Sequence, residues 1–438
     1  MDTRYNHWLV KLLNLREEET SLVINFLLLN FLQGIGIAFF FTTANALFLA
    51  EFKITYLPYV YVASAFLMLI TGRIYAHYEH ALPLKKFLPF ITLVLALSPL
   101  LFLFGIFTFK LLWLPFLLLV WHQVMYLLNS LRFWGISALV FDVRQSKRLF
   151  GLISAGDIPA KLLGYLAVSA LVPFIGMESL LVISTISFVS GFFILRKVLA
   201  EAGHKLEKES HHTVTSEDNI PGKLAFLKKF FGDHFILVLA LLSFIATIAF
   251  TFIDFSFLSE VKYAFKTDKE LAYFFGLFFG LGNAVTIITK LFFSGRIVNK
   301  IGIKYCLLIL PLLLLIIALI TNIAGIVSGE HQVFLWLFGI MMLISEVFKY
   351  TLHEPVFLTL FQPLDTHQRL HGHTIVKAVI NPVGLGIAGL ILTGFINYFQ
   401  GVNLFYINVL ITFLVICWII TVFVTNKKYV EILRNAID

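Results

Sequence analysis

The sequence predicts an all-α membrane protein in which twelve helices cross the bilayer. Of its 438 residues, 59% are hydrophobic and only 13% are charged, whereas a soluble domain has about 25% charged residues. The mean hydropathy is +0.92. Apolar stretches of the roughly 20 residues that a membrane-spanning helix needs recur along the whole chain. This composition excludes a pair of soluble domains, which the length alone would allow.

The apolar stretches divide into two sets of six. We expect spans near residues 21–50, 56–78, 87–109, 113–140, 150–173, 179–198, 233–260, 271–295, 303–325, 333–361, 372–396 and 403–425. Apolar and basic side chains at helical spacing before the first span predict a short helix on the membrane surface. We therefore expect an N-terminal six-helix bundle over residues 1–200, a cytoplasmic linker over 201–230 and a C-terminal six-helix bundle over 231–438.

The distribution of Lys and Arg predicts the orientation of the spans, because these residues accumulate in cytoplasmic loops. With the N-terminus inside, the inner segments hold 23 of the 33 Lys and Arg residues and the outer segments hold 5. Both termini and the linker are therefore expected in the cytoplasm.

Short motifs recur about half the chain length apart, which indicates an internal duplication. The pairs are FLAEFK at 48–53 with FLSEVK at 257–262, GRI at 72–74 with GRI at 295–297, and RLFG at 148–151 with RLHG at 369–372. Because six spans separate the copies, the two halves enter the membrane in the same direction. Such parallel repeats relate the two halves of major facilitator transporters, which bind substrate between the halves near the midplane. We expect that fold.

Several longer stretches resemble bacterial members of the ADP/ATP translocase-like branch of the major facilitator superfamily. They are ANALFLAEF with LPYVYVASA (44–52, 57–65), FWGISALVFDVRQSKRLFGLISAGD (133–157), DFSFLSEVKYAF with ELAYFFGLFFGLGNAVTIITKLFFSGRI (254–265, 270–297) and FQPLDTHQRLHGHTIVKAVINPVGLGIAGL (361–390). The resemblance implies a nucleotide transporter of the bacterial inner membrane that exchanges ATP for ADP. The first span carries no charge between Phe31 and Ala50, where the named exchangers have a charged run.

Charged residues inside the spans are the candidate functional residues, because a charge in lipid is costly and is by default functional. The cations are Arg132, Lys161, Lys290, Lys349 and Lys377, and the acids are Asp157, Asp254, Glu346 and Glu354. One more cation than acid fits an anionic solute. The spacing of Asp157 and Lys161 puts them on one helix face, where they either pair privately or face the substrate. Glu346 with Lys349 allows the same two interpretations.

The other cations have no acid one turn away on their own helix. Lys377 and Lys290 must therefore reach another helix, water or a ligand. The guanidinium of Arg132 suits a phosphate or a gate at the cytoplasmic mouth. We expect Lys377, Lys290, Arg132, Lys161 and Asp157 to bind substrate. We expect Glu346, Glu354, Lys349, Asp254 and Pro382 to act in coupling or gating, with Pro382 softening the eleventh span at INPVGLGIAGL.

These features together predict a transporter that works by alternating access and exchanges an anionic solute such as a nucleotide. No Walker lysine loop, HExxH or GxSxG motif is present, so we expect no enzyme, no cofactor and no metal. The expected partners are the solute and the bilayer, without nucleic acid, and the expected state is a monomer. The alternatives are a proton-coupled carrier that depends on Glu346 or Glu354, and a non-transporting scaffold or sensor whose span charges all form closed pairs.

Overall fold

The computed structural model describes most of the chain and is helical throughout the described part. The described residues are 17–109, 112–140, 156–201, 234–292, 294–327, 329–363, 372 and 375–435. The predicted surface helix before the first span, the linker and the RLFG motif lie outside them. Twelve helices in the described part are long and apolar enough to cross a membrane, so the predicted fold class is confirmed.

The first six spans are single helices. They are α2 (Glu17–Glu51), α3 (Leu57–Ala81), α4 (Leu84–Phe109), α5 (Leu114–Val140), α7 (Asp157–Ile175) and α8 (Ser179–Glu201). The shortest of them, α7, has 19 residues and is about 28 Å long at 1.5 Å per residue, which is close to the thickness of the hydrocarbon core.

The next six spans include two composite helices. The single helices are α11 (His234–Ala264), α12 (Asp268–Phe292), α13 (Ser294–Val327) and α18 (Leu404–Asn435). The tenth span consists of α14 (His331–Phe348), the π-helical segment η2 (Lys349–His353) and α15 (Glu354–Thr359). The eleventh consists of the π-helical segment η3 (Val376–Ile380) and α17 (Asn381–Tyr398).

Each π-helical segment ends just before a proline, Pro355 in the tenth span and Pro382 in the eleventh. A proline has no N–H and its ring clashes with the carbonyl one turn earlier, which a wider turn relieves. Wide turns of this kind are frequent at functional sites. The π-helical segment before Pro382 is thus an irregularity at the place where we predicted that the eleventh span is softened. The role of Pro382 in gating stays a prediction.

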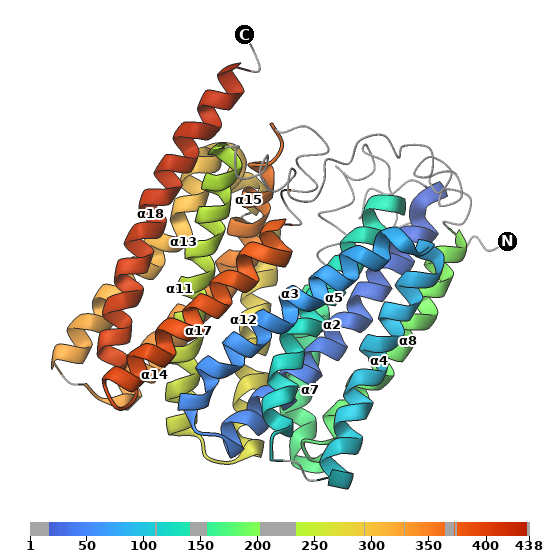
Figure 1. Cartoon of the computed structure of the whole chain (residues 1–438), viewed down its shortest axis with the longest axis horizontal. Coiled ribbons are helices and arrows are strands. Elements are labelled where there is room, and N and C mark those ends of the chain that lie inside the picture. The colour runs from blue at the N-terminus through green and yellow to red at the C-terminus, as the bar shows by residue number, and fades with distance from the viewer. Residues whose placement is uncertain are drawn as a thin grey trace.

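The helices form two groups that lie side by side (Figure 1). The N-terminal group contains α2 to α8 and the C-terminal group contains α11 to α18. Between the groups, α7 packs against α12 and α3 packs against α17. The fifth helix of each group therefore contacts the second helix of the other. This reciprocal pairing is what a duplication with two parallel halves requires.

The two ends of the bundle differ in which segments they carry. The distal end holds the connections at residues 52–56, 265–267 and 399–403, at the lower edge of Figure 1. The terminal end, opposite, holds the start of α2 and the end of α18.

Glycines bring the two groups into close contact. A Cβ atom at Gly276 of α12 would lie 2.2 Å from Ser169 Oγ and 2.6 Å from the backbone oxygen of Tyr165, both in α7. A Cβ atom at Gly389 of α17 would lie 2.7 Å from the backbone oxygen of Pro58 in α3. Small residues commonly allow helices to pack closely in membranes. Here the glycines allow α12 to approach α7 and α17 to approach α3 across the interface.

Candidate functional site

Most of the predicted charged residues meet at the interface between the two groups. We call this set the interface cluster, and its members are Asp157, Lys161, Lys290, Glu346, Lys349, Glu354 and Lys377, with the aromatic residues Tyr126 and Tyr350. They come from α5 and α7 of the N-terminal group and from α12, α14, η2, α15 and η3 of the C-terminal group. Both groups therefore contribute to one polar site.

Asp157 and Lys161 form an ion pair, as their spacing on one helix face allows. The Lys161 ammonium lies 2.9 Å from Asp157 Oδ2 at the start of α7. It also lies over the rings of Tyr126 and Tyr350, 5.7 and 5.2 Å from their centroids. The hydroxyls of these two tyrosines are 3.2 Å apart. Because Tyr350 belongs to the C-terminal group, Lys161 connects the two groups rather than forming a private pair.

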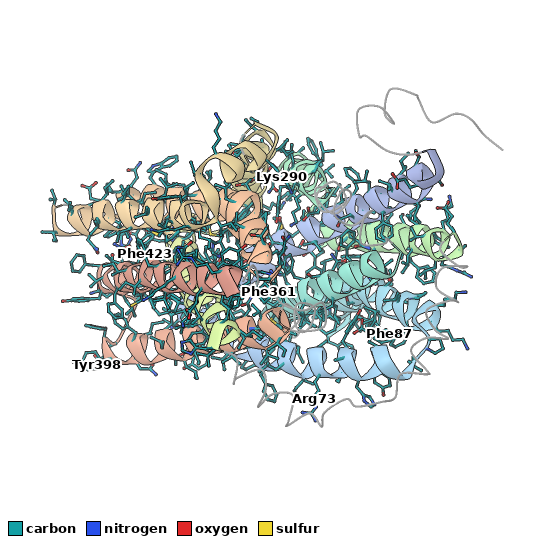
Figure 2. The ribbon with its side chains drawn as sticks, turned by 90° about the horizontal axis from the view of Figure 1, so that it is seen from above. Arg73, Phe87, Lys290, Phe361, Tyr398 and Phe423 are labelled. Atoms are coloured by element: carbon teal, nitrogen blue, oxygen red, sulfur yellow. The ribbon has the colours of Figure 1, made fainter. Side chains whose placement is uncertain are left out.

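Lys377 finds its carboxylate on another element, as the absence of one on its own helix requires. Its ammonium donates to Glu354 Oε1 at 2.9 Å, and about a third of each side chain is exposed. Seen from above, Lys290 lies in the region between the two groups (Figure 2). Its charge interacts with those of Asp157, Glu354 and Lys161, so it belongs to the same electrostatic unit.

Glu346 and Lys349 do not form an ion pair with each other, which was one of the two interpretations that their spacing allows. The Lys349 ammonium instead lies 4.9 Å from the ring centroid of Phe250 and 5.4 Å from that of Tyr350. Glu346 makes no ion pair or hydrogen bond within the described ranges of the chain. The backbone N–H of Lys349 still bonds to the backbone oxygens of Ser345 and Glu346, so the separation of the two side chains comes from their orientation and not from the helix register. Lys161 and Lys349, one from each group, thus both lie against the ring of Tyr350.

Arg132 does not join the interface cluster. It is fully buried inside the N-terminal group, where its guanidinium donates to Thr92 Oγ1 and to Asn129 Oδ1 at 2.7 Å. The predicted excess of cations survives without it, because the cluster contains four lysines and three carboxylates. The positive balance therefore belongs to the interface cluster and does not depend on Arg132.

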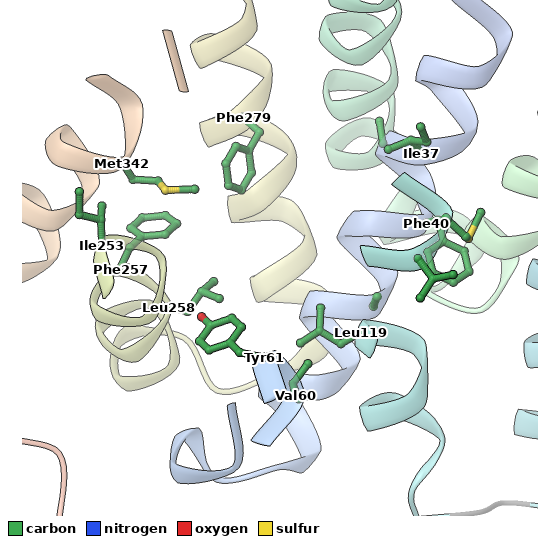
Figure 3. Close-up of a cluster of buried hydrophobic side chains, with 14 of the residues drawn as sticks. Ile37, Phe40, Val60, Tyr61, Leu119, Ile253, Phe257, Leu258, Phe279 and Met342 are labelled. Carbon is green, nitrogen blue, oxygen red and sulfur yellow. The ribbon is translucent and has the colours of Figure 1, made fainter. Parts of the chain in front are cut away.

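Asp254 forms a separate bond between the groups, on the distal side of the cluster. It accepts a hydrogen bond of 2.7 Å from the hydroxyl of Tyr61. Figure 3 shows this hydroxyl pointing from α3 toward Leu258 of α11. A cavity of about 30 Å³ lies beside the bond, lined in part by His122 and Gln123, and one water molecule fits such a volume. The bond thus joins α3 to α11 on the distal side of the cluster, and the role of Asp254 in gating stays a prediction.

An aromatic layer lies between the interface cluster and the distal end. Phe41 of α2 contacts Tyr165, Phe275 and Phe279, with ring centroids 5.9, 6.4 and 5.1 Å away. Tyr165 lies one turn beyond Lys161 along α7, so the cluster sits nearer the terminal end than the midplane position we expected. Sequence reasoning missed this layer and the two tyrosines of the cluster, because nothing distinguishes them among 48 Phe and 15 Tyr residues.

The described part of the chain contains no group of three or more His, Cys, Asp or Glu residues that could hold a metal ion. The His-containing linker segment around residues 204–212 lies outside the described residues. The chemistry that the site offers is therefore that of ammonium groups, carboxylates and tyrosine hydroxyls. Such a set binds a polar anion, or exchanges protons with one.

Comparisons with known proteins agree with this description. The family model described as TLC ATP/ADP transporter matches residues 23–429. The ADP,ATP carrier protein 1 of Chlamydia pneumoniae is 21% identical over 343 residues, which are 71% of this chain and 65% of the relative. The ADP,ATP carrier protein 1 of Rickettsia typhi (strain ATCC VR-144 / Wilmington) is 22% identical over 337 residues, or 70% and 66%. The chain thus spans just under two thirds of the length of these relatives.

Among solved structures, a D-xylose-proton symporter aligns over 92% of this chain and 97% of its own, with a TM-score of 0.63 and 14% identity. At that identity the likeness shows the fold alone. It is the major facilitator fold that the parallel repeats predicted.

Proposed function

Because the chain belongs to the TLC ATP/ADP transporter family, we propose that it exchanges an anionic, phosphate-bearing solute such as ATP or ADP across a membrane. The observation that carries this proposal is the interface cluster. Alternating access requires a site that both halves of the protein contact, and the cluster takes Lys161 from one group and Lys290, Lys349 and Lys377 from the other.

The geometry of the lysines supports a phosphate-bearing substrate. Lys349 has aromatic rings against its ammonium, and among the described residues no carboxylate forms a direct ion pair with it, so a substrate oxygen can become its direct partner. Lysine is a common phosphate ligand and acts there as a point charge. The ion pair of Lys377 with Glu354 is partly exposed, so an incoming phosphate can compete with the carboxylate for the ammonium.

A proton-coupled carrier is the second candidate, and one observation favours it. Glu346, a carboxyl group of the interface cluster, makes no ion pair or hydrogen bond with the rest of the described chain. In this mechanism Glu346 would take up a proton as the substrate binds. A scaffold with only closed ion pairs is disfavoured by the same residue and by Lys349.

The orientation follows from the distribution of Lys and Arg. We propose that the terminal end faces the cytoplasm of a bacterial cell and that the chain resides in the inner membrane as a monomer. The distal end, where Tyr61 and Asp254 bond across the interface, then faces outward. The structure would represent the state that is closed to the outside.

The proposal is tested by uptake of radiolabelled ATP and ADP into proteoliposomes with and without unlabelled nucleotide inside. We expect uptake that depends on the internal nucleotide and is reduced at least about tenfold in Lys349→Gln, since one charged contact is worth about 1.5–3 kcal/mol. Lys304→Gln is the matched control, because Lys304 also lies over aromatic rings, those of Tyr305 and Phe423, but outside the interface cluster.

Two other results would change the proposal. Uptake that needs no internal nucleotide but stops when the proton gradient is dissipated would favour the proton-coupled carrier, and Glu346→Gln would then abolish it. No uptake of either nucleotide, from protein whose thermal unfolding is normal, would exclude ATP and ADP as substrates.

A further inference from the structure

A second cavity, with several charged groups in a largely apolar lining, lies at the distal end of the C-terminal group, away from the interface cluster. Its volume is about 510 Å³, within the range of small-molecule sites. The ends of α11 and α13 and the starts of α14 and α18 enclose it, together with Ile54 from the connection between α2 and α3. The proposed exchange mechanism makes no use of this cavity.

The lining of the cavity has a positive charge balance. Lys262 and Lys266 are its two ammonium groups and Glu260 is its carboxylate. Glu260 is only 1% exposed, and His331 Nδ1 lies 3.1 and 3.2 Å from its two oxygens. The carboxylate therefore already has a partner, and the lysines determine what the cavity attracts.

Aromatic rings on the rim hold these charged groups in place. The ring of Tyr263 stacks on that of His331 with centroids 3.7 Å apart, and the Lys266 ammonium lies 5.1 Å from the Tyr263 centroid. Stacking on Tyr263 and bonding to Glu260 together fix the orientation of His331. Its other ring nitrogen and the amide of Asn403, which also lines the cavity, are further polar groups for a ligand.

Lys262 also contacts the other half of the protein. Its ammonium donates hydrogen bonds to the backbone oxygens of Leu49 and Ala50 at the end of α2. These oxygens belong to the FLAEFK motif, and Lys262 is the last residue of the duplicate motif FLSEVK. Lys53, the equivalent residue of the first copy, is exposed. Of the two equivalent lysines, Lys262 thus lies at the cavity and at the interface between the groups, whereas Lys53 is exposed.

We propose that this cavity is a peripheral binding site for a phosphate-bearing molecule, and that the bound phosphate competes with the α2 carbonyl oxygens for the ammonium of Lys262. An ionised phosphate is a stronger acceptor for an ammonium than a neutral carbonyl. Occupation of the cavity therefore weakens a contact that joins the two groups at the distal end. The ligand is a membrane-lipid headgroup or a soluble polyphosphate, which share the same recognition chemistry.

The test measures how fast individual lysines are acetylated, by peptide mass spectrometry of the full-length protein in a maltoside detergent that contains no phosphate. One arm adds inorganic pyrophosphate, and the other adds phosphatidylglycerol. We expect at least one of them to slow acetylation of Lys262 and Lys266 about fivefold or more. Lys53 is the internal control and should change less than twofold. The arm that protects identifies the source of the phosphate.

Two variants show whether the protection is local. Lys266→Gln should raise the probe concentration needed to protect Lys262 at least about tenfold, because it removes a charged contact from the cavity. Lys377→Gln, in the interface cluster, should leave that concentration unchanged, so the result is independent of whether the protein exchanges nucleotides. Protection in neither arm, equal protection of Lys53, or protection that needs Lys377 would overturn the proposed site.

Competition between the bound phosphate and the α2 carbonyl oxygens for Lys262 is measured separately, by the reactivity of a cysteine at the distal interface. The side chain of Leu258 is 3% exposed at the distal interface, so a cysteine at this position reacts with maleimide only when the interface opens. The protecting probe should raise that reaction rate, and Lys262→Met should raise it without probe. A rate that the probe leaves unchanged would refute the competition.

Discussion

Replacing Tyr61 with Phe should shift the protein toward a state that is open at the distal end. The substitution removes only the hydroxyl that donates to Asp254 Oδ2 at 2.7 Å. This bond joins α3 of one group to α11 of the other, so it exists only while the distal interface is closed. Its loss therefore destabilises the closed state and leaves the open state unchanged.

The size of the shift follows from the chemistry of the bond. Tyr61 is 3% exposed, and its partner is a carboxylate that keeps no other hydrogen bond within the described part of the chain. Hydrogen bonds to charged groups are worth about 1.5–3 kcal/mol. A change of that size in the free-energy difference between two states alters their ratio by about 10- to 150-fold.

The assay uses the cysteine at Leu258, which lies beside Tyr61 (Figure 3). The two native cysteines, Cys306 and Cys417, are free and are first replaced by Ala. The rate of reaction with a membrane-impermeant maleimide is proportional to the open fraction when opening is fast. We therefore expect the rate to rise at least about tenfold in Tyr61→Phe.

The matched control is Tyr75→Phe. Tyr75 is 4% exposed inside the N-terminal group, and its hydroxyl has no hydrogen-bond partner in the described structure. The same chemical change there should leave the reaction rate within twofold. Equal rates for the two variants would refute the assignment of the Tyr61 bond to distal closure.

Three further substitutions test other parts of the structure. Gly276→Ala should separate the two groups and accelerate the same cysteine reaction, because the new Cβ atom would lie 2.2 Å from Ser169 Oγ. The control is Gly282→Ala, where a Cβ atom would have no other atom within 4 Å, and it should leave the reaction rate unchanged. Arg132→Met should lower the thermal unfolding midpoint and leave the apparent substrate affinity unchanged, since Arg132 is buried away from the interface cluster. A reduced affinity at normal stability would contradict this placement of Arg132. Lys161→Met should reduce exchange at least about tenfold. Most of the expression level should be kept, because Met retains the apolar stem of Lys161 and the carboxylate of Asp157, 29% exposed, can be hydrated. Loss of folded protein would instead indicate a structural pair.

The sequence was sufficient where a feature depends on composition or on residues close together in the chain. The twelve spans follow from apolar length, and the parallel relation of the halves follows from the spacing of the repeated motifs. The pairing of Asp157 with Lys161 follows from one turn of a helix. For Glu346 and Lys349 the same helical spacing allowed a pair, but the ammonium of Lys349 lies against the rings of Phe250 and Tyr350 instead.

Contacts between distant elements were beyond sequence reasoning. The absence of an acid near Lys377 on its own helix required a partner elsewhere, but only the packing of η3 against its neighbours identified Glu354. Arg132 had the same signature as the other span cations, a charge in an apolar stretch, and only the packed structure separated it from the interface cluster. The aromatic residues of the site carried no signal in a chain so rich in Phe.

Composition and motif spacing were enough to predict a duplicated membrane protein of twelve spans with charges placed inside them. These properties arise from the cost of exposing polar groups to lipid, which acts on each segment separately. The packed structure was needed to show which charges meet, that both groups contribute to one site, and that the groups are bonded to each other at the distal end. Those outcomes depend on which helix faces come together, and that is set by the packing of glycines and aromatic side chains from segments far apart in the chain.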